Sequence, residues 1–105
     1  MVQEISVIEL KALLEGDADV HLYDVRTEQE RAICSIEGAV LLTQEVAEEI
    51  DALPKETKLV FHCHHGGRSY QAAAYFAQRG FSDCVNVAGG IDAWSLAVDP
   101  STPRY

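Results

Sequence analysis

Apolar residues gather in short runs along the chain, and segments with apolar residues at helical spacing separate these runs. The runs predict strands at residues 20–25, 39–42, 58–62 and 84–87. In the third run Leu59, Val60 and Phe61 follow one another without a polar residue. Such an unbroken run is typical of a strand that is covered on both faces of its sheet.

Helical spacing and start and stop signals predict helices between the strands. Ser6 and Glu9 form a capping box, in which the two side chains satisfy free N–H groups at a helix start, and Thr27 and Glu30 form a second one. The predicted helices are one from Ser6 to Gly16, a short one after Thr27, one at about 44–53, one at 68–79 and a short one that carries Trp94. From Asp99 onward the tail is predicted to be extended.

The alternation of strands and helices predicts an α/β fold, with a mostly parallel sheet and helices on both faces. We expect residues 1–105 to form one domain, because the length is that of a single small domain and no linker or repeat divides it. Tyr75 and Phe76 are predicted to lie in the core. Ligands bind beyond the carboxyl ends of the strands in such sheets, so the segment after residues 58–62 is where a site is expected.

The net charge of the chain limits the kinds of molecule that it is expected to bind. Eight basic and 17 acidic residues give a formal net charge of −9, which repels nucleic acid and anionic membrane surfaces. The longest apolar run, 72–77, is far shorter than a membrane span, and the first residues show no secretion signal. Three cysteines are an odd number for a disulfide framework. Together these features favour the cytoplasm.

The segment after the third strand reads Cys63-His64-His65-Gly66-Gly67-Arg68-Ser69. A cysteine between a strand and a helix start meets amide N–H groups and the positive end of the helix dipole, and both favour the thiolate. The two glycines allow several N–H groups to face one point. Arg68 either adds a positive charge at the rim or braces the loop carbonyls. This pattern predicts a nucleophilic or sulfur-carrying cysteine, with Tyr70 of the following helix at the border of its pocket.

Two other interpretations of the same residues are open. A lone cysteine at the end of a buried strand is most often a small core residue, although the glycines and the Arg-Ser helix start argue against that here. His62-Cys63-His64-His65 also offers four metal ligands in a row. Structural zinc sites need a second ligand pair, and His21, Cys34 and Cys84 stand singly. No metal site is therefore predicted.

Several motifs resemble single-domain rhodaneses, the sulfurtransferases. Cys-x-x-Gly-x-Arg-Ser at 63–69 resembles their active-site loop, and Asp24-Val25-Arg26 resembles their amino-terminal Asp-Val-Arg motif. Gly38-Ala39 resembles the end of a third motif, and residues 85–90 followed by Trp94 resemble the carboxyl-terminal signature. These motifs span most of the chain in the family's order.

The resemblance implies a rhodanese-like fold with a five-stranded parallel sheet flanked by helices, and a site built around one cysteine. Cys63 would take a sulfane sulfur from thiosulfate or a persulfide and pass it to an acceptor thiol or other nucleophile. The loop residues would cradle that sulfur: His64, His65, Gly66, Gly67, Arg68 and Ser69. Asp24 and Arg26 would support the loop. The resemblance implies no metal or organic cofactor.

Two alternative functions remain within this family. Related phosphatases and arsenate reductases have a loop longer by one residue, whereas four residues separate Cys63 from Arg68 here. A non-catalytic module for protein interaction or sulfur sensing is the other alternative. The presence of both the loop cysteine, Cys63, and the loop arginine, Arg68, argues against it.

Departures from the family pattern bear on the donor and on a second thiol. His64 and His65 stand where thiosulfate-preferring enzymes carry cationic side chains, and with the net charge of −9 this favours a persulfide donor. Cys34 stands in place of the usual glycine of a Gly-His pair, and is either a resolving thiol for Cys63 or simply a buried thiol.

The tail resembles rhodanese domains fused to monothiol glutaredoxins or to enzymes that adenylylate ubiquitin-like proteins. It therefore suggests a glutaredoxin, an iron–sulfur protein or a ubiquitin-like sulfur carrier as partner.

Overall fold

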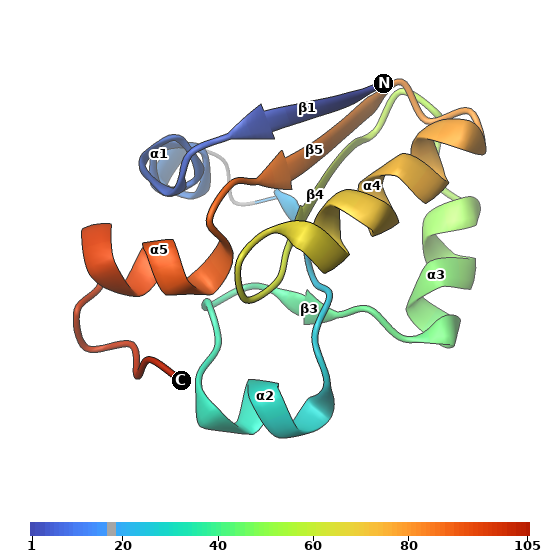
Figure 1. The fold of residues 1–105 in the computed structure, drawn as a ribbon. Helices are drawn as coiled ribbons and strands as arrows, with labels where there is room; N and C mark the ends of the chain where they lie inside the picture. Colours follow the sequence, from blue (N-terminus) through green and yellow to red (C-terminus); the bar gives the residue numbers. More distant parts are fainter. Residues whose placement is uncertain (17–18) are drawn as a thin grey trace.

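The computed structural model describes residues 1–16 and 19–105 and arranges them around one parallel sheet (Figure 1). Within these residues the sheet has five strands: β1 (Val2–Ile5), β2 (His21–Asp24), β3 (Val40–Leu41), β4 (Lys58–His62) and β5 (Asp83–Val87). Their order across the sheet is β1-β5-β4-β2-β3. Strand β4 therefore lies in the middle, between β5 and β2, and its carboxyl end opens at the centre of one sheet edge.

Helices cover both faces of the sheet, as predicted. The described helices are α1 (Val7–Gly16), α2 (Glu28–Ile33), α3 (Gln44–Asp51), α4 (Gly67–Gln78) and α5 (Gly90–Ala97). Figure 1 shows α1 and α5 on one side of the sheet and α3 and α4 on the other, with α2 beyond the carboxyl ends of the strands.

The alternation of side chains along β4 explains this layering. Leu59 and Phe61 point into a core with Phe76 of α4, whereas Val60 points into the opposite core with Leu10 of α1. All five side chains are essentially inaccessible to solvent. A strand whose residues are apolar on both faces can be stable only where helices cover both, so the Leu-Val-Phe run determines the central position of β4.

Both predicted capping boxes form. The Ser6 hydroxyl accepts the Glu9 amide at 3.1 Å, and the Glu9 carboxylate accepts the Ser6 amide at 2.9 Å. Thr27 and Glu30 make the same reciprocal pair at the start of α2. The elements otherwise follow the predicted ones, with ends that differ by one or two residues.

Three features differ from the sequence predictions. The hydrophobic pattern does not predict strand β1, because Gln3 and Glu4 are exposed at the sheet edge. The tail is not extended: the Thr102 amide donates to the Asp99 carbonyl at 3.0 Å, which turns the chain back toward the site. Tyr75 is 52% exposed rather than in the core, because the turn of α4 that buries Phe76 directs the neighbouring Tyr75 side chain away from the sheet; the two rings meet edge-on.

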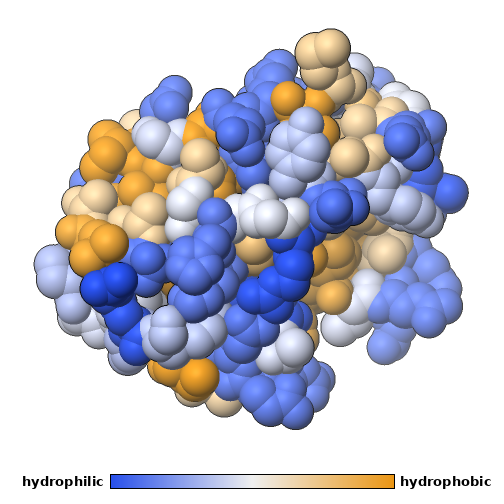
Figure 2. Space-filling model, viewed as in Figure 1, coloured by the Kyte–Doolittle hydropathy of each residue, from blue (hydrophilic) through white to orange (hydrophobic). Residues whose placement is uncertain are grey.

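On the face of the molecule that Figure 1 views, hydrophobic and hydrophilic residues are unevenly distributed. Figure 2 shows apolar residues at the left, over α1 and α5, and hydrophilic residues across the centre. The exposed apolar side chains include Ile8 of α1 and Leu96 of α5. No helix in the described ranges has both the length and the apolar character that a membrane crossing requires.

Candidate active site

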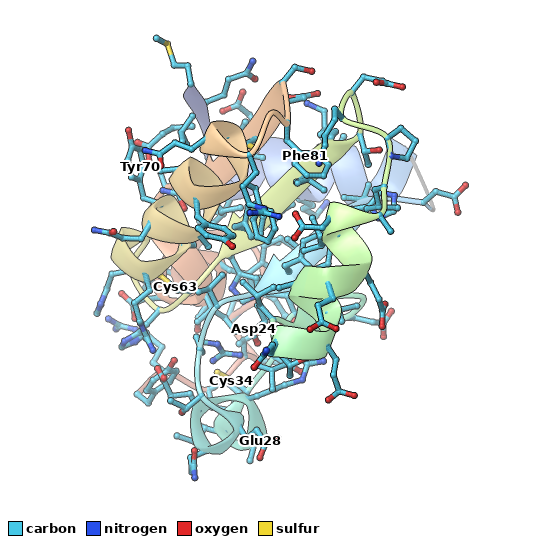
Figure 3. The ribbon with its side chains drawn as sticks, turned by 90° about the vertical axis from the view of Figure 1, so that its right-hand side faces the viewer. Asp24, Glu28, Cys34, Cys63, Tyr70 and Phe81 are labelled. Atoms are coloured by element: carbon cyan, nitrogen blue, oxygen red, sulfur yellow. The ribbon has the colours of Figure 1, made fainter. Side chains whose placement is uncertain are left out.

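Cys63 follows β4 directly, and the turn that it begins runs into α4 (Figure 3). Neighbouring segments hold the backbone of this turn on two sides. The Val25 amide donates to the His62 carbonyl at 2.7 Å, and the Ile91 amide of α5 donates to the Cys63 carbonyl at 2.8 Å. The Asp92 amide donates to the His64 carbonyl at 3.1 Å. The loop is therefore fixed by backbone contacts from both the end of β2 and α5.

Glycines make this close approach feasible. Gly66 has φ +110°, a left-handed conformation that lets the chain turn into α4 while its amide donates to the Cys63 sulfur. Gly90 has φ +58°, and a Cβ atom there would lie only 2.3 Å from the Cys63 carbonyl oxygen. The sequence signature that ends in Gly89-Gly90 therefore serves to let α5 begin against the loop.

Several hydrogen-bond donors converge on the Cys63 sulfur. The Gly66 amide donates at 3.1 Å, the Ser69 amide at 3.4 Å and the Ser69 hydroxyl at 3.3 Å. Both Cys63 and Ser69 are buried. Burial by itself raises the pKa of the Cys63 thiol, but these donors and the Arg68 amide outweigh burial and hold the pKa below its ordinary value. The loop thus stabilises a negatively charged sulfur through amide and hydroxyl donors.

Ser69→Ala is expected to shift the pH profile of Cys63 toward higher pH. A hydrogen bond to a charged group contributes about 1.5–3 kcal/mol, so alkylation of Cys63 near neutral pH should slow by roughly tenfold or more. The measurement is the rate of iodoacetamide modification of Cys63 from pH 5 to 10. Ser95→Ala is the matched control, because its buried hydroxyl donates to the Thr102 carbonyl instead. Equal profiles for the two variants would contradict the role given to Ser69.

The Ser69 hydroxyl belongs to a longer chain of hydrogen bonds. The Asn86 side-chain carbonyl on β5 lies within hydrogen-bond distance of it as a second acceptor. The Asn86 amide nitrogen donates to the Gly66 carbonyl at 3.1 Å and to a Glu4 carboxylate oxygen at 2.7 Å. Neither Glu4 nor Asn86 was predicted as a site residue from the sequence. Asn86 is a buried polar residue inside the apolar strand β5, and this was the signal available in the sequence.

The Arg68 guanidinium turns to Glu30 rather than to the loop carbonyls that it was predicted to brace, whereas its charge still interacts electrostatically with Cys63, as the other predicted role requires. Its guanidinium donates to both carboxylate oxygens of Glu30, at 2.7 and 2.8 Å. This bidentate pair holds the pKa of Glu30 well below its usual range and that of Arg68 above its own. The Tyr105 hydroxyl donates to the same carboxylate at 2.8 Å. Glu30 therefore joins α2, α4 and the tail, and it offsets the one arginine charge of the loop.

Asp24 and Arg26 form a buried pair beside the site. The Arg26 guanidinium donates to both Asp24 oxygens at 2.7 Å, and neither side chain reaches solvent. Arg26 also donates to the Cys34 carbonyl at 2.8 Å. His62, whose Nε2 lies 3.9 Å from Asp24, is buried, and this lowers its pKa to about 4. The supporting role predicted for Asp24 and Arg26 is consistent with these contacts but stays a prediction.

Cys34 is buried in the core cluster on the α1 and α5 side of the sheet. Its sulfur lies 3.9 Å from an Arg26 nitrogen, in the region between β2 and α2 that Figure 3 shows. A resolving function for Cys34 stays a prediction. Cys84 is buried in the opposite core, and burial raises the pKa of its thiol.

The histidines and Tyr105 line the rim of the loop. The His64 ring stacks on the Tyr105 ring with centroids 4.0 Å apart and an interplanar angle of 9°. The His65 side chain is 68% exposed. A hollow of about 410 Å³ opens beside the loop, and its lining includes His65, Gly66, Gly67 and Tyr70. This hollow gives an incoming molecule a place next to the loop.

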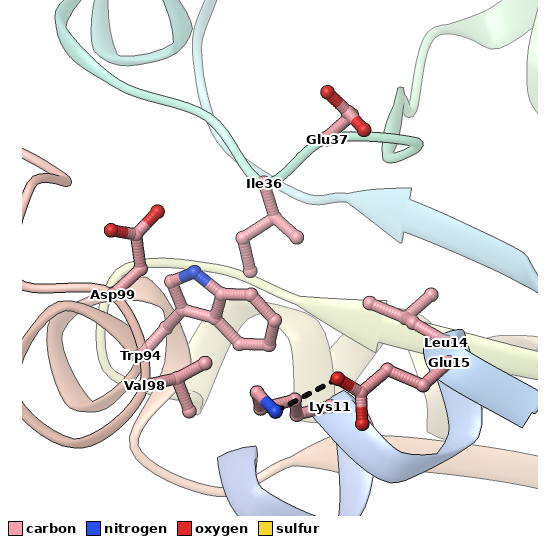
Figure 4. Close-up of a pocket in the computed structure, with 8 residues that line it drawn as sticks. All are labelled: Lys11, Leu14, Glu15, Ile36, Glu37, Trp94, Val98 and Asp99. Atoms are coloured by element: carbon pink, nitrogen blue, oxygen red, sulfur yellow. Dashed lines mark hydrogen bonds and ion pairs between the residues drawn. The ribbon is translucent and has the colours of Figure 1, made fainter.

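A second hollow of about 390 Å³ lies between α1, α5 and the segment before β3 (Figure 4). Figure 4 shows the Trp94 ring beside Ile36, opposite a Lys11–Glu15 ion pair of 2.8 Å. None of the loop residues 63–69 lines it. The chemistry of Cys63 therefore has no direct access to this hollow.

With this geometry in place, comparison with known proteins decides the family. The rhodanese-like domain matches residues 6–97. The chain belongs to the rhodanese-like family. A sulfurtransferase from Allochromatium vinosum is 38% identical to this rhodanese-like chain over 96 residues, which make up 90% of both. The crystal structure of a rhodanese-like domain protein from Staphylococcus aureus superposes with a TM-score of 0.77 at 30% identity and covers 98% of each chain.

One relative contains the rhodanese-like region as part of a larger protein. The probable adenylyltransferase/sulfurtransferase MoeZ from Mycobacterium tuberculosis is 35% identical over 100 residues, which are 92% of this chain and 26% of that protein. The predicted likeness to rhodanese domains fused to adenylylating enzymes is therefore confirmed at the level of sequence.

Proposed function

We propose that this chain is a sulfurtransferase that moves a sulfane sulfur through a persulfide on Cys63. The observation that carries the proposal is the convergence of the Gly66 amide, the Ser69 amide and the Ser69 hydroxyl on one buried sulfur. A sulfurtransferase that the chain matches over nine-tenths of its length supports the same activity. The remaining loop residues, His64, His65, Gly67 and Arg68, shape the rim and the turn.

The reaction consists of two displacements. In the first, the Cys63 thiolate attacks the outer sulfur of a donor persulfide, the donor S–S bond breaks, and the donor leaves as its thiolate. The resulting Cys63 persulfide carries its negative charge beside the loop donors. In the second, an acceptor nucleophile takes the outer sulfur and the Cys63 thiolate is regenerated. The number of electrons balances in each step, so no external oxidant is needed.

The donor class follows from the charges around the loop. Glu30 offsets the Arg68 charge, and the chain as a whole carries −9. Thiosulfate carries two negative charges on one small ion, so its capture depends more on fixed positive charge beside the loop than capture of a persulfide does, whose reacting end carries at most one. We therefore place a thiol persulfide ahead of thiosulfate as the donor.

Intact mass spectrometry tests the proposal. Incubation with glutathione persulfide should add one sulfur, about 32 Da, and cyanide should remove it as thiocyanate. Loading by thiosulfate at equal concentration should be slower. Cys63→Ser should gain no mass, whereas Cys84→Ser, which removes a thiol of the opposite core, should load normally. A folded protein with a free Cys63 that no donor loads would show that the chain is a binding module instead.

The phosphatase alternative has less support. A phosphatase needs an arginine side chain that turns toward the loop to hold the phosphate, and the Arg68 guanidinium is engaged with Glu30 instead. The spacing of four residues between Cys63 and Arg68 also matches the shorter loop. An aryl-phosphate assay that gives no turnover is the expected result.

The acceptor and the cellular setting are part of the proposal. The likeness to MoeZ favours a ubiquitin-like sulfur carrier as acceptor over a glutaredoxin or an iron–sulfur protein. We place the reaction in the cytoplasm, because the three cysteines are free and Cys63 must be reduced to react.

A further inference from the structure

Two imidazoles and one carboxylate meet at the rim of the Cys63 loop. His64 and His65 come from the loop, and Asp92 comes from the first turn of α5. One ligand atom from each residue lies within 4.8 Å of the other two. Residues so far apart in the sequence give no signal of this grouping, which depends on α5 starting against the loop.

The backbone fixes this grouping. The Asp92 amide donates to the His64 carbonyl at 3.1 Å, and the preceding amide, that of Ile91, donates to the Cys63 carbonyl at 2.8 Å. Gly90 has no side chain to hold the two segments apart. The carboxylate is thereby held beside the histidines by main-chain contacts and does not depend on a chance side-chain conformation.

The histidine nitrogens are available as ligands. Among the described residues, His64 Nε2 is a buried nitrogen without a hydrogen-bond partner. His65 Nε2 lies 3.8 Å from an Asp92 oxygen, which is too far for a hydrogen bond. A buried polar nitrogen without a hydrogen-bond partner is energetically unfavourable, and coordination of an ion beside the two imidazoles would satisfy it.

We propose that His64, His65 and Asp92 form a binding site for a divalent transition-metal ion of the Zn²⁺ class. Two imidazoles with one carboxylate are a donor set that such ions prefer, whereas Mg²⁺ and Ca²⁺ favour oxygen ligands only. Zinc bonds of about 2.0–2.2 Å hold ligand atoms roughly 3.5 Å apart. The three ligand atoms here lie within 4.8 Å of one another, so side-chain rotations must bring them closer, including rotation of the His65 ring away from the His64 ring that it contacts. His65 is exposed, so solvent can reach an ion held there, and the net charge of −9 attracts cations.

Arg104 is the residue that competes with the ion. Its guanidinium donates to Asp92 at 3.0 Å from Nε and 3.5 Å from a terminal nitrogen. Its side chain is 56% exposed, so the ion pair is weak and can open. Removal of this positive charge is expected to tighten metal binding, because it frees the Asp92 carboxylate for the ion.

Zinc binding to the untagged full chain tests the proposal. Cys63→Ser is used as the background, because it removes the reactive thiol as a ligand and makes the result independent of sulfur transfer. Competition with a chromophoric chelator should show one Zn²⁺ per chain. Affinity should fall at least tenfold in His65→Asn and in Asp92→Asn, and it should rise in Arg104→Gln. His21→Asn, which changes a histidine of β2, should leave the affinity unchanged.

Two results would overturn the site. The first is the absence of stoichiometric Zn²⁺ binding in the Cys63→Ser background, or an affinity that His65→Asn does not change. His65 is exposed, so this variant is expected to fold, and circular dichroism verifies it. The second is a sulfur-to-metal charge-transfer band when Co²⁺ replaces Zn²⁺ in that background, because it would place the ion at Cys34 or Cys84.

Discussion

Gly90→Ala is expected to abolish sulfur loading and to destabilise the fold. The added Cβ would lie 2.3 Å from the Cys63 carbonyl oxygen and 2.5 Å from that of His64. Both oxygens accept amides of α5, so neither can move without loss of a hydrogen bond. Steric overlap of this kind costs about 1–3 kcal/mol, and the left-handed φ of +58° adds about 1–2 kcal/mol for a residue with a side chain.

Thermal unfolding and mass spectrometry after glutathione persulfide check this prediction together. A loss of about 3 kcal/mol lowers the melting temperature by more than roughly 10 °C in a domain of this size. Gly16→Ala is the control, since nothing lies within 4 Å of a Cβ at that position. A Gly90→Ala protein that melts and loads like the wild type would mean that the loop and α5 are not held as described.

Asp24→Asn is expected to destabilise the chain more than any exposed charge change. The Arg26 guanidinium would keep its burial and lose its buried anion, and breaking such a pair costs about 3–5 kcal/mol. Asp51→Asn is the control, because it breaks an ion pair with Arg79 that has the same bidentate form but is partly exposed to solvent. Its melting temperature should change little.

The double variant Asp24→Leu/Arg26→Met separates the cost of an unpaired buried charge from the loss of the contacts that Arg26 makes with other groups near the site. Replacement of a buried ion pair by apolar side chains is often neutral, so the double variant should recover most of the stability that Asp24→Asn loses. Arg31, which also pairs with Asp24, is partly exposed and can be hydrated when that partner is removed. Its sulfur loading should still fall, because Arg26 also holds the Cys34 carbonyl and the Tyr105 hydroxyl. Recovery of stability together with full activity would remove Asp24 and Arg26 from the support of the site.

The central elements of the fold could be predicted because local signals and burial agree in them. The Leu59-Val60-Phe61 run is apolar on both faces and lies in the middle of the sheet. Strand β1 has the opposite character: Gln3 and Glu4 face solvent, and pairing with β5 holds the strand in place. Pairing partners are non-local, so the pattern of residues 2–5 carries no strand signal of its own.

The site residues likewise divide into those that a local sequence signal predicts and those that distant segments bring together. Cys63, Gly66 and Ser69 lie within seven residues, and the expected cradle of N–H groups follows from a turn that enters a helix. The partner of Arg68 could not be predicted, because Glu30 belongs to α2, and its capping box with Thr27 already gave it a local explanation. Tyr105 reaches the same carboxylate only because the tail turns at Thr102.

The Ser69 hydroxyl carries a single hydrogen, yet two acceptors lie within its reach, the Cys63 sulfur and the Asn86 carbonyl. The Asn86 amide cannot turn around to help, since Glu4 and Gly66 both accept from its nitrogen. The hydrogen can therefore point to only one acceptor at a time, and the charge on the Cys63 sulfur determines which one. A neutral thiol leaves it with Asn86, whereas a thiolate draws it away. In the proposed sulfur transfer, the Ser69 O–H bond would follow the change of charge on the sulfur by rotation, with no movement of the loop backbone required for that hydrogen bond.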